Sequence, residues 1–236
     1  MTALLRRAVT CVPVRRTKLG TDSRACALHE TFAFPSPPKV PRNGFEIIFA
    51  EMGCLPMPVV RNKEIEVLFS ASAIARRNLE LAKEIASRDY HDLLVISVLK
   101  GSFVFAADLI RAMHDVGLSP EVEFIFISSY GAGTTSGEVR ILRDIDNDVA
   151  GRDVLLIDDI LESGKTLKFT RELMQKRGAK SVAIAVLLDK HTRRQTALEA
   201  DFVGFECPDY FVVGYGMDVA HAFRELPFVG IVRGDA

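Results

Sequence analysis

The sequence predicts an α/β fold in which a parallel sheet is flanked by helices. Three short apolar runs carry this prediction, and they span 93–99, 154–157 and 182–188. Runs of this length and composition are typical of strands that are buried on both faces of a parallel sheet. Polar residues follow each run directly. They would therefore lie at the carboxyl ends of the strands, where open α/β sheets bind their ligands.

The composition limits the chain to one globular domain with an appendage. It has 236 residues, of which 48% are hydrophobic and 26% are charged, and this suffices for one good core. The net charge of −1 gives no general attraction to nucleic acid or to an anionic membrane. The four cysteines include no C-x-x-C pair, so neither a zinc site nor a disulfide framework is indicated. We therefore expect the protein to be located in the reducing cytoplasm. No apolar run reaches the roughly 18 residues that cross a bilayer.

Residues 1–56 differ in composition from the rest of the chain. They carry eight basic and four acidic residues, a net charge of +4, whereas 57–236 carry 22 and 27, a net charge of −5. Prolines also gather between Pro35 and Pro58, and we expect disorder or a loose extension. An Arg-rich start with few acids can be an organelle transit peptide. It can equally be upstream sequence translated from a wrong start before Met57, and we favour this second reading.

The first elements after this extension follow from short-range patterns. Residues 59–68 alternate enough to be a strand. Ser70 or Ser72 can then cap a helix, because a serine hydroxyl accepts a hydrogen bond from a free N–H of the first turn. Apolar side chains would line one face of this helix, namely Ile74, Leu81 and Ile85.

The next part of the chain predicts a strand, a helix and a strand. Their expected spans are 93–99, 103–116 and 122–129. The first of these strands ends in Lys100-Gly101-Ser102, a polar turn at a carboxyl end. Residues 130–137 contain three glycines and two threonines, and they form either a hairpin connection or an active-site lid. Residues 139–145 would return as a further strand.

Segment 152–170 carries the strongest functional pattern. After its apolar strand, Asp158 and Asp159 deliver two carboxylates to the crevice at the sheet edge. The residues that follow, Glu162-Ser163-Gly164-Lys165-Thr166, supply backbone N–H groups and two hydroxyls just before an amphipathic helix at 167–177. A loop that leads into a helix N-terminus is a ready site for phosphate.

A nucleotide-triphosphate P-loop is the obvious alternative, because Gly164-Lys165-Thr166 matches the end of that motif. We reject it, since the motif requires glycine where this chain has Asp159, and a carboxylate there would repel the triphosphate. Two acids beside a monophosphate cradle suit a ligand with a ribose diol and a 5′-phosphate, because carboxylates accept hydrogen bonds from hydroxyls. A plainer alternative is a solvated acidic turn before an ordinary capped helix. For the whole arrangement we favour the functional reading.

The C-terminal part continues the alternation of helices and strands. Gly178 is well placed to end the helix, and a buried strand follows at 182–188. The strand ends in Asp189-Lys190. From the residues alone, the basic residues after Lys190 look solvated. Those basic residues are His191, Arg193 and Arg194.

Segment 152–170 resembles the phosphoribosyl pyrophosphate signature of the type I phosphoribosyltransferases. Segment 201–218 is a second match, and the resemblance runs in matching order from about Met57 to the C-terminus. It is nearest to the members that use hypoxanthine and guanine. It implies the type I phosphoribosyltransferase fold, with a small hood formed by about 57–68 and 190–236. It also implies purine salvage, in which a 5-phosphoribosyl group passes from phosphoribosyl pyrophosphate to a 6-oxopurine.

The resemblance assigns most polar residues at the strand ends to phosphoribosyl pyrophosphate. The implied contacts are Lys100, Gly101, Asp158, Asp159, Glu162, Ser163, Gly164, Lys165, Thr166 and Arg224. In the family, a cis peptide joins the residues that match Leu99 and Lys100. Magnesium is the implied cofactor, and this hard cation prefers carboxylate and phosphate oxygens. Its implied ligands are Asp158, Asp159 and Asp218. Ser129 and Tyr130 would belong to a flexible loop that shields the reacting centre from water.

The resemblance assigns the purine to the hood. The implied contacts are Lys190, Phe211, Val212 and Asp218. Lys190 would donate to the purine O6, and the ring of Phe211 would stack on the purine face, although by composition Phe211 could be core. Glu162 is the implied catalytic base for the purine N7 proton. Many members of the family carry Asp at this position, so this chain departs from the pattern there.

Two other functions stay open. One is a phosphoribosyltransferase for another base, and the other is a non-catalytic regulator of this fold that binds nucleic acid. A regulator should present a basic face, and the net charge of −5 over 57–236 argues against one. We therefore expect a cytoplasmic enzyme with small-molecule substrates, no nucleic-acid or membrane partner, and a homo-oligomeric state, dimer or tetramer.

Overall fold

The computed structural model describes residues 59–61, 63–129 and 139–233 of the chain. The predicted extension, 1–56, and the predicted lid, 130–137, lie outside the described residues. The strands are β1 (Val59–Val60), β2 (Lys63–Phe69), β3 (Leu94–Leu99), β4 (Glu121–Ser129), β5 (Val139–Arg143), β6 (Asp153–Leu161), β7 (Ser181–Asp189), β8 (Phe202–Glu206), β9 (Val212–Val213) and β10 (Val229–Val232). The helices are α1 (Ala71–Ala86), α2 (Phe103–Asp115) and α3 (Lys165–Lys176). Within these ranges, no helix combines the length and the hydrophobicity that a membrane-spanning segment requires.

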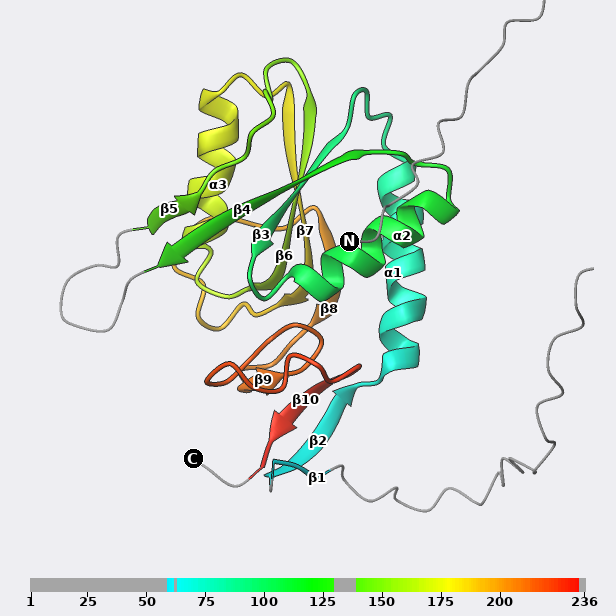
Figure 1. Cartoon of the computed structure of the whole chain (residues 1–236), viewed down its shortest axis with the longest axis vertical. Helices are drawn as coiled ribbons and strands as arrows, with labels where there is room; N and C mark the ends of the chain where they lie inside the picture. The colour runs from blue at the N-terminus through cyan, green and yellow to red at the C-terminus, as the bar shows by residue number, and fades with distance from the viewer. Residues whose placement is uncertain (1–58, 62, 130–138, 234–236) are drawn as a thin grey trace, which may run out of the picture. The chain divides into compact units, whose positions relative to one another are not determined.

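A six-stranded sheet has the order β5-β4-β3-β6-β7-β8. From β4 to β8 the neighbouring strands pair in parallel, whereas β5 runs antiparallel to β4. The predicted parallel sheet is therefore confirmed. At its centre, β3 and β6 pair in a register that sets Ser97 opposite Ile157. The carboxyl ends of these two strands consequently lie side by side (Figure 1).

Helices cover both faces of this large sheet (Figure 1). α1 and α2 pack on one face, where Phe105 shares a buried cluster with Leu155 of β6. α3 packs on the other face, where Leu167 and Met174 share a cluster with Leu156. Successive residues of a strand point to opposite faces, so the continuous apolar run of β6 supplies both cores. This is why continuous apolar runs predict the central strands.

The predicted capping residues lie at the expected helix ends, Ser70 at the start of α1 and Gly178 after the end of α3. Ser70 precedes α1, and its Oγ accepts a hydrogen bond of 3.3 Å from the N–H of Ala73. Gly178 lies just beyond α3 with a φ of 87°. The N–H of Ala179 then donates to the carbonyl of Met174 at 3.1 Å. A left-handed residue followed by such a bond is a common helix end that glycine favours, so both predictions are confirmed.

β6 extends further than the sequence predicts, because it continues past residue 157 to Leu161. Asp158 and Asp159 therefore lie within the strand and not after it. Asp158 pairs with Val186 of β7, which itself extends to Asp189. The backbone of β7 thus supplies hydrogen-bond partners that carry β6 beyond its apolar run, and backbone pairing of this kind leaves no mark in the hydrophobic pattern.

A second, smaller sheet has the order β1-β2-β10-β9. It joins the start of the described chain to its end, because β10 pairs antiparallel with both β2 and β9. Ile65, Val213 and Phe223 belong to its own buried cluster. The spans predicted for the hood, 57–68 and 190–236, contain these strands except for Phe69 at the end of β2, but they also contain β8, which pairs with β7 in the large sheet. That the small sheet binds a purine stays a prediction.

Candidate active site

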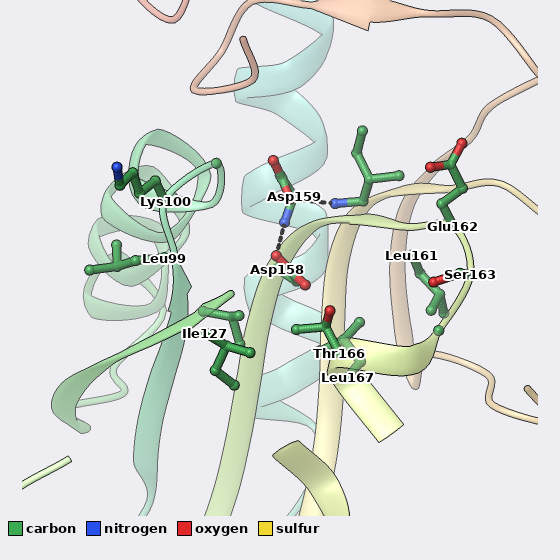
Figure 2. A pocket seen from close by; sticks show the side chains of 14 residues that line it. Leu99, Lys100, Ile127, Asp158, Asp159, Leu161, Glu162, Ser163, Thr166 and Leu167 are labelled. Carbon is green, nitrogen blue, oxygen red and sulfur yellow. Dashed lines mark hydrogen bonds between the residues drawn. The ribbon is translucent and has the colours of Figure 1, made fainter. Parts of the chain in front are cut away.

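A pocket of about 270 Å³ opens at the carboxyl ends of β3 and β6. Its walls come from the turn after β3 and from the segment that joins β6 to α3. Figure 2 shows Asp158 and Asp159 between Lys100 on one side and Glu162 and Thr166 on the other. The predicted site residues that line the pocket are Lys100, Gly101, Asp158, Asp159, Glu162, Ser163, Gly164 and Thr166. The fold therefore brings them together at one edge of the sheet, while their individual roles stay predictions.

The turn after β3 approaches the acidic pair closely. The peptide between Leu99 and Lys100 is cis, as the resemblance implies. A Cβ added to Gly101 would lie 1.7 Å from Oδ2 of Asp159, so glycine is required for the turn to pass this carboxylate. The Nζ of Lys100 lies 5.1 Å from the ring centroid of Phe126, and the lysine is exposed. Lys100 thus presents a positive charge at the pocket.

Asp158 and Asp159 form a largely buried acidic pair. The N–H of Asp159 donates to Oδ1 of Asp158 at 3.0 Å, and the N–H of Ile160 donates to Oδ1 of Asp159 at 2.9 Å (Figure 2). Burial and the neighbouring charge of Asp159 raise the pKa of Asp158 well above its ordinary value. Burial also raises the pKa of Asp159, although its hydrogen bonds and the charge of Arg224 act to lower it. A cation or hydroxyl donors would offset the cost of these two buried carboxylates.

The segment from Glu162 to Gly164 turns the chain from β6 into α3. Gly164 directly precedes the helix with a φ of 79°, a conformation that glycine adopts without strain. Among the described residues, the backbone N–H groups of Glu162, Ser163 and Gly164 have no acceptor. The N–H of Lys165 has only a long contact, 3.4 Å, with Oγ of Ser163. Open N–H groups at a helix N-terminus attract anions, and this geometry supports the predicted phosphate cradle.

Lys190 is buried, and only 5% of its surface is exposed. Its Nζ donates to the carbonyl of Tyr210 at 2.7 Å and lies 3.6 Å from Oε1 of Glu162. Lys190 follows β7 and Glu162 follows β6, so the two neighbouring strands bring these residues together. The Glu162 side chain keeps 41% of its surface exposed and can therefore meet a ligand.

Phe211 and Val212 differ sharply in exposure. Phe211 is 64% exposed, which excludes the alternative that it belongs to the core. Val212 lies in β9 and is 5% exposed. Water contact with a large apolar ring costs free energy, and stacking on a flat ligand would remove that contact. The exposure of Phe211 therefore supports the predicted stacking role.

Asp218 and Arg224 form an ion pair in which Nη2 of Arg224 lies 2.5 Å from Oδ1 of Asp218. Arg224 also donates from Nη1 to the carbonyl of Gly216 at 2.5 Å. A Cβ added to Gly216 would lie 2.2 Å from the carbonyl oxygen of Gly101. The turn that holds this ion pair therefore touches the turn after β3, and the two predicted pyrophosphate-binding turns are neighbours.

The predicted loop and metal ligands have less support from these contacts. Ser129 is the last residue of β4, and Tyr130 lies outside the described residues, so their shielding role stays a prediction. In the described part of the chain, no three acidic, histidine or cysteine side chains are grouped as a metal site. Asp218 therefore does not complete a closed set of ligands with Asp158 and Asp159.

Arg194 is a largely buried residue behind the site, and the sequence pattern did not indicate its position. The expectation that it is solvated is wrong, because only 13% of its side chain is exposed. Its guanidinium donates to the carbonyl of Leu161 at 3.2 Å and to that of Glu162 at 3.1 Å. A basic residue in a polar loop is usually solvated, and no spacing in the sequence indicates that these carbonyls would come within its reach.

Tyr215 is a second buried polar residue that the sequence pattern did not identify. Its hydroxyl donates to Oδ2 of Asp108 at 2.5 Å and accepts a hydrogen bond of 2.9 Å from Asn78. Burial and the bond to Asp108 raise the pKa of Tyr215 above its ordinary value. Tyr215 directly precedes Gly216, so it fastens to α1 and α2 the turn that carries the Asp218–Arg224 pair.

Comparisons with known proteins agree with one another. The sequence profile of the phosphoribosyl transferase domain matches residues 65–220. The hypoxanthine phosphoribosyltransferase of Escherichia coli (strain K12) is 44% identical over 172 residues, which cover 71% of this chain and 95% of the relative. The hypoxanthine-guanine phosphoribosyltransferase of Bacillus subtilis (strain 168) is 48% identical over 171 residues, which cover 71% and 93%. A crystal structure of a hypoxanthine phosphoribosyltransferase from Staphylococcus aureus aligns with a TM-score of 0.67 at 40% identity, covering 71% of this chain and 91% of that one.

Proposed function

The chain belongs to the phosphoribosyl transferase domain family, and from that premise we propose that it is a hypoxanthine (guanine) phosphoribosyltransferase of purine salvage. It transfers the 5-phosphoribosyl group of phosphoribosyl pyrophosphate to hypoxanthine or guanine, giving IMP or GMP and pyrophosphate. Relatives with 44% and 48% identity bear names that specify these purines. The single observation that carries the proposal is the buried Lys190 ammonium, 3.6 Å from Glu162.

The proposed purine site lies where Lys190, Glu162 and Phe211 converge. Lys190 donates one bond to Tyr210, and an ammonium has three donors, so it retains the capacity to donate to the purine O6. The exposed ring of Phe211 stacks on the purine, while main-chain groups of Val212 read its edge. Glu162 accepts the N7 proton as the base forms its new bond to the ribose carbon C1. The C1–O bond to pyrophosphate breaks, and pyrophosphate leaves with that electron pair.

We propose that phosphoribosyl pyrophosphate lies along the edge formed by β3 and β6. The open N–H groups from Glu162 to Gly164 bind its 5′-phosphate, together with residues at the start of α3. Those residues are Lys165 and Thr166, and Ser163 contributes its hydroxyl. Asp158 and Asp159 accept hydrogen bonds from the ribose diol. Lys100 and Arg224 stabilise the negative charge that develops on the leaving pyrophosphate in the transition state.

Magnesium is the proposed cofactor. Two largely buried carboxylates with raised pKa values, Asp158 and Asp159, fit a hard cation, and the ion pair of Asp218 with Arg224 offers a third acid nearby in the fold. Because the described residues contain no three-ligand cluster, pyrophosphate and ribose oxygens would supply the remaining ligands. When bound, the ion supplies charge neutralisation at the leaving group.

We propose a homo-oligomer, a dimer or a tetramer. Exposed apolar side chains support it, since Phe103, Phe124 and Leu142 are 44%, 46% and 55% exposed. Light scattering coupled to size-exclusion chromatography tests this, and a monomer at micromolar concentration would contradict it. A cytoplasmic location is also proposed, on the basis that Cys207, the cysteine in the described residues, is free and buried. Cell fractionation tests that location.

We propose that residues 57–236 suffice for folding and activity. The family profile begins at residue 65, and the first described strand begins at Val59. Residues 1–56 carry a net charge of +4, opposite in sign to the −5 of residues 57–236. The fragment should express in soluble form and retain the turnover of the full chain. Insolubility, or loss of most of the activity, would make the extension part of the functional protein.

A panel of hypoxanthine, guanine, adenine, uracil and orotate, each with phosphoribosyl pyrophosphate and Mg²⁺, tests the proposed function against its alternatives. Hypoxanthine and guanine should be turned over. Turnover of uracil or orotate in their place would identify a transferase for another base. Binding of phosphoribosyl pyrophosphate with no turnover of any base, together with DNA or RNA binding, would identify the regulator.

A further inference from the structure

A second layer of contacts lies behind the phosphate cradle and is made by residues 194–196. The guanidinium of Arg194 donates from Nη2 to the carbonyl of Leu161 at 3.2 Å and from Nε to that of Glu162 at 3.1 Å. The N–H of Gln195 donates to the carbonyl of Ser163 at 3.0 Å, and Oγ1 of Thr196 donates to the same oxygen at 3.4 Å. Three consecutive carbonyls, of residues 161–163, thus all accept hydrogen bonds from one short segment, and the carbonyl of Leu161 also accepts one of 3.0 Å from the N–H of Lys190.

Arg194 is itself held in place by its remaining bonds. Its guanidinium also donates to the carbonyl of Leu198 and to the carboxylate of Asp189. Only 13% of the Arg194 side chain and 6% of the Asp189 side chain are exposed. The planar guanidinium has five N–H donors in a rigid fork, and a lysine ammonium cannot serve the same set of acceptors.

The cradle and the segment 194–196 are also packed closely. A Cβ added to Gly164 would lie 2.2 Å from Oγ1 of Thr196 and 3.3 Å from Cδ of Arg194. Because there is no space between them, a displacement of the segment must displace the loop as well.

These contacts set the direction of the N–H groups in the cradle. In a trans peptide unit, the C=O of one residue and the N–H of the next point in opposite directions. Carbonyls 161–163 point toward residues 194–196, so the N–H groups of residues 162–164 point away from that segment. These are the N–H groups for which the described residues contain no acceptor.

We propose that Arg194, with the backbone of Gln195 and the hydroxyl of Thr196, positions the cradle for the 5′-phosphate of phosphoribosyl pyrophosphate. Arg194 acts from behind the loop and is a positioning residue, without contact to the ligand. This inference rests on the proposed function, which supplies the identity of the phosphate ligand. In this role, residues 194–196 keep the carbonyl oxygens of residues 161–163 directed away from the anion site.

The test compares Arg194→Lys with wild type and with Arg193→Lys, in the full chain. Arg193 is the adjacent arginine, is 62% exposed and pairs with Asp209, so its replacement controls for charge and position. Calorimetric titration with phosphoribosyl pyrophosphate and Mg²⁺, without a purine, should show about tenfold weaker binding for Arg194→Lys, equivalent to the loss of one charged hydrogen bond. The KM for phosphoribosyl pyrophosphate should rise by a similar factor. The KM for hypoxanthine should change less than threefold, and Arg193→Lys should match wild type.

Thr196→Val provides a second variant that keeps the shape and removes one weak bond, and about two- to fivefold weaker binding is expected. Unchanged binding by folded Arg194→Lys would overturn the inference and leave Arg194 a purely structural residue. If Arg194→Lys does not fold, unchanged binding by Thr196→Val overturns it. A wild type that binds phosphoribosyl pyrophosphate but turns over no purine would count against the proposed function alone, since the binding comparison does not depend on turnover.

Discussion

The ammonium nitrogen of Lys190 lies 3.6 Å from the carboxylate oxygen Oε1 of Glu162. Lys190 is almost fully buried, whereas Glu162 is partly exposed at the pocket. One residue can donate to an acceptor on a purine while the other accepts a proton from the same ring. In the proposed reaction, the pairing of β6 with β7 therefore brings the residue that recognises the base beside the residue that accepts its proton.

Glu162→Gln should lower kcat by about 10²–10⁴-fold, because it keeps the shape of the side chain and removes its basicity. Binding of phosphoribosyl pyrophosphate should change little. Glu162→Asp should be tolerated better, since many members of the family carry Asp at this position. Steady-state kinetics checks this, with Glu199→Gln as the control for an exposed acid in a nearby loop.

The competing role for Glu162 is a favourable charge near the N-terminus of α3. In that case Gln would cost about 0.3–1 kcal/mol of stability and leave kcat nearly intact. A Glu162→Gln enzyme within a few-fold of the wild-type kcat would end the general-base assignment.

Adenine should be a poor substrate, because its 6-amino group is a donor and would face the Lys190 ammonium, which is also a donor. The lost bond and the unpaired buried charge should lower kcat/KM by roughly a hundredfold or more relative to hypoxanthine. Competition between the two bases in one reaction measures this ratio. Comparable turnover of adenine and hypoxanthine would rule out the assigned role of Lys190.

Asp153 should contribute stability that depends on pH. Burial raises the pKa of Asp153, but bonds from Ser181 Oγ, the N–H of His91 and Lys180 Nζ together hold it below its ordinary value. These bonds are 2.6, 2.8 and 3.0 Å long. Because the folded pKa is the lower one, this contribution is complete above the unfolded value of about 3.9 and is lost as the pH falls through the folded value.

Asp153→Asn should therefore cost about 2 kcal/mol at pH 7 and progressively less below pH about 3.9. Urea unfolding at a series of pH values measures the difference between the two proteins. A difference that stays constant down to the acid limit would show that the charge of Asp153 is not what stabilises the fold.

Asp158→Asn should stabilise the free protein and abolish activity. The substitution keeps an acceptor for the N–H of Asp159 and removes a buried carboxyl group whose ionised form is disfavoured by burial and by the charge of Asp159. With Mg²⁺ chelated, Tm should rise by about 2–4 °C for each kcal/mol gained. Calorimetry measures Tm, and Asp146→Asn, whose aspartate is 81% exposed, is the matched control. A lower Tm for Asp158→Asn than for this control would mean that the acidic pair stabilises the fold.

The central strands could be predicted because their physics is local. β3, β6 and β7 are buried on both faces, so their hydrophobic pattern is continuous. Ser70 and Gly178 could likewise be identified as helix caps, since capping involves only neighbouring residues. The position of β8 at the edge of the large sheet could not be predicted, because it depends on pairing with β7.

The residues of the candidate site also fall into those that the sequence could predict and those that it could not. Polar residues at strand ends were recognisable, and parallel pairing brings their strands together at one edge. Contacts between distant loops were not recognisable. Arg194 reaches carbonyls more than thirty residues earlier in the chain, at Leu161 and Glu162, and the buried Lys190 donates to the carbonyl of Tyr210, twenty residues later. Such contacts follow from tertiary packing and have no signature in spacing.

The stoichiometry of the reaction of purified full-length protein with hypoxanthine, phosphoribosyl pyrophosphate and Mg²⁺ tests the proposed transfer directly. IMP and pyrophosphate, separated and quantified over time, should appear in equal amounts, with no release of free ribose 5-phosphate. Equal amounts would establish that the bond broken at C1 is replaced by a bond to the purine. Pyrophosphate released with ribose 5-phosphate and without IMP, or no reaction, would rule out transfer to the purine.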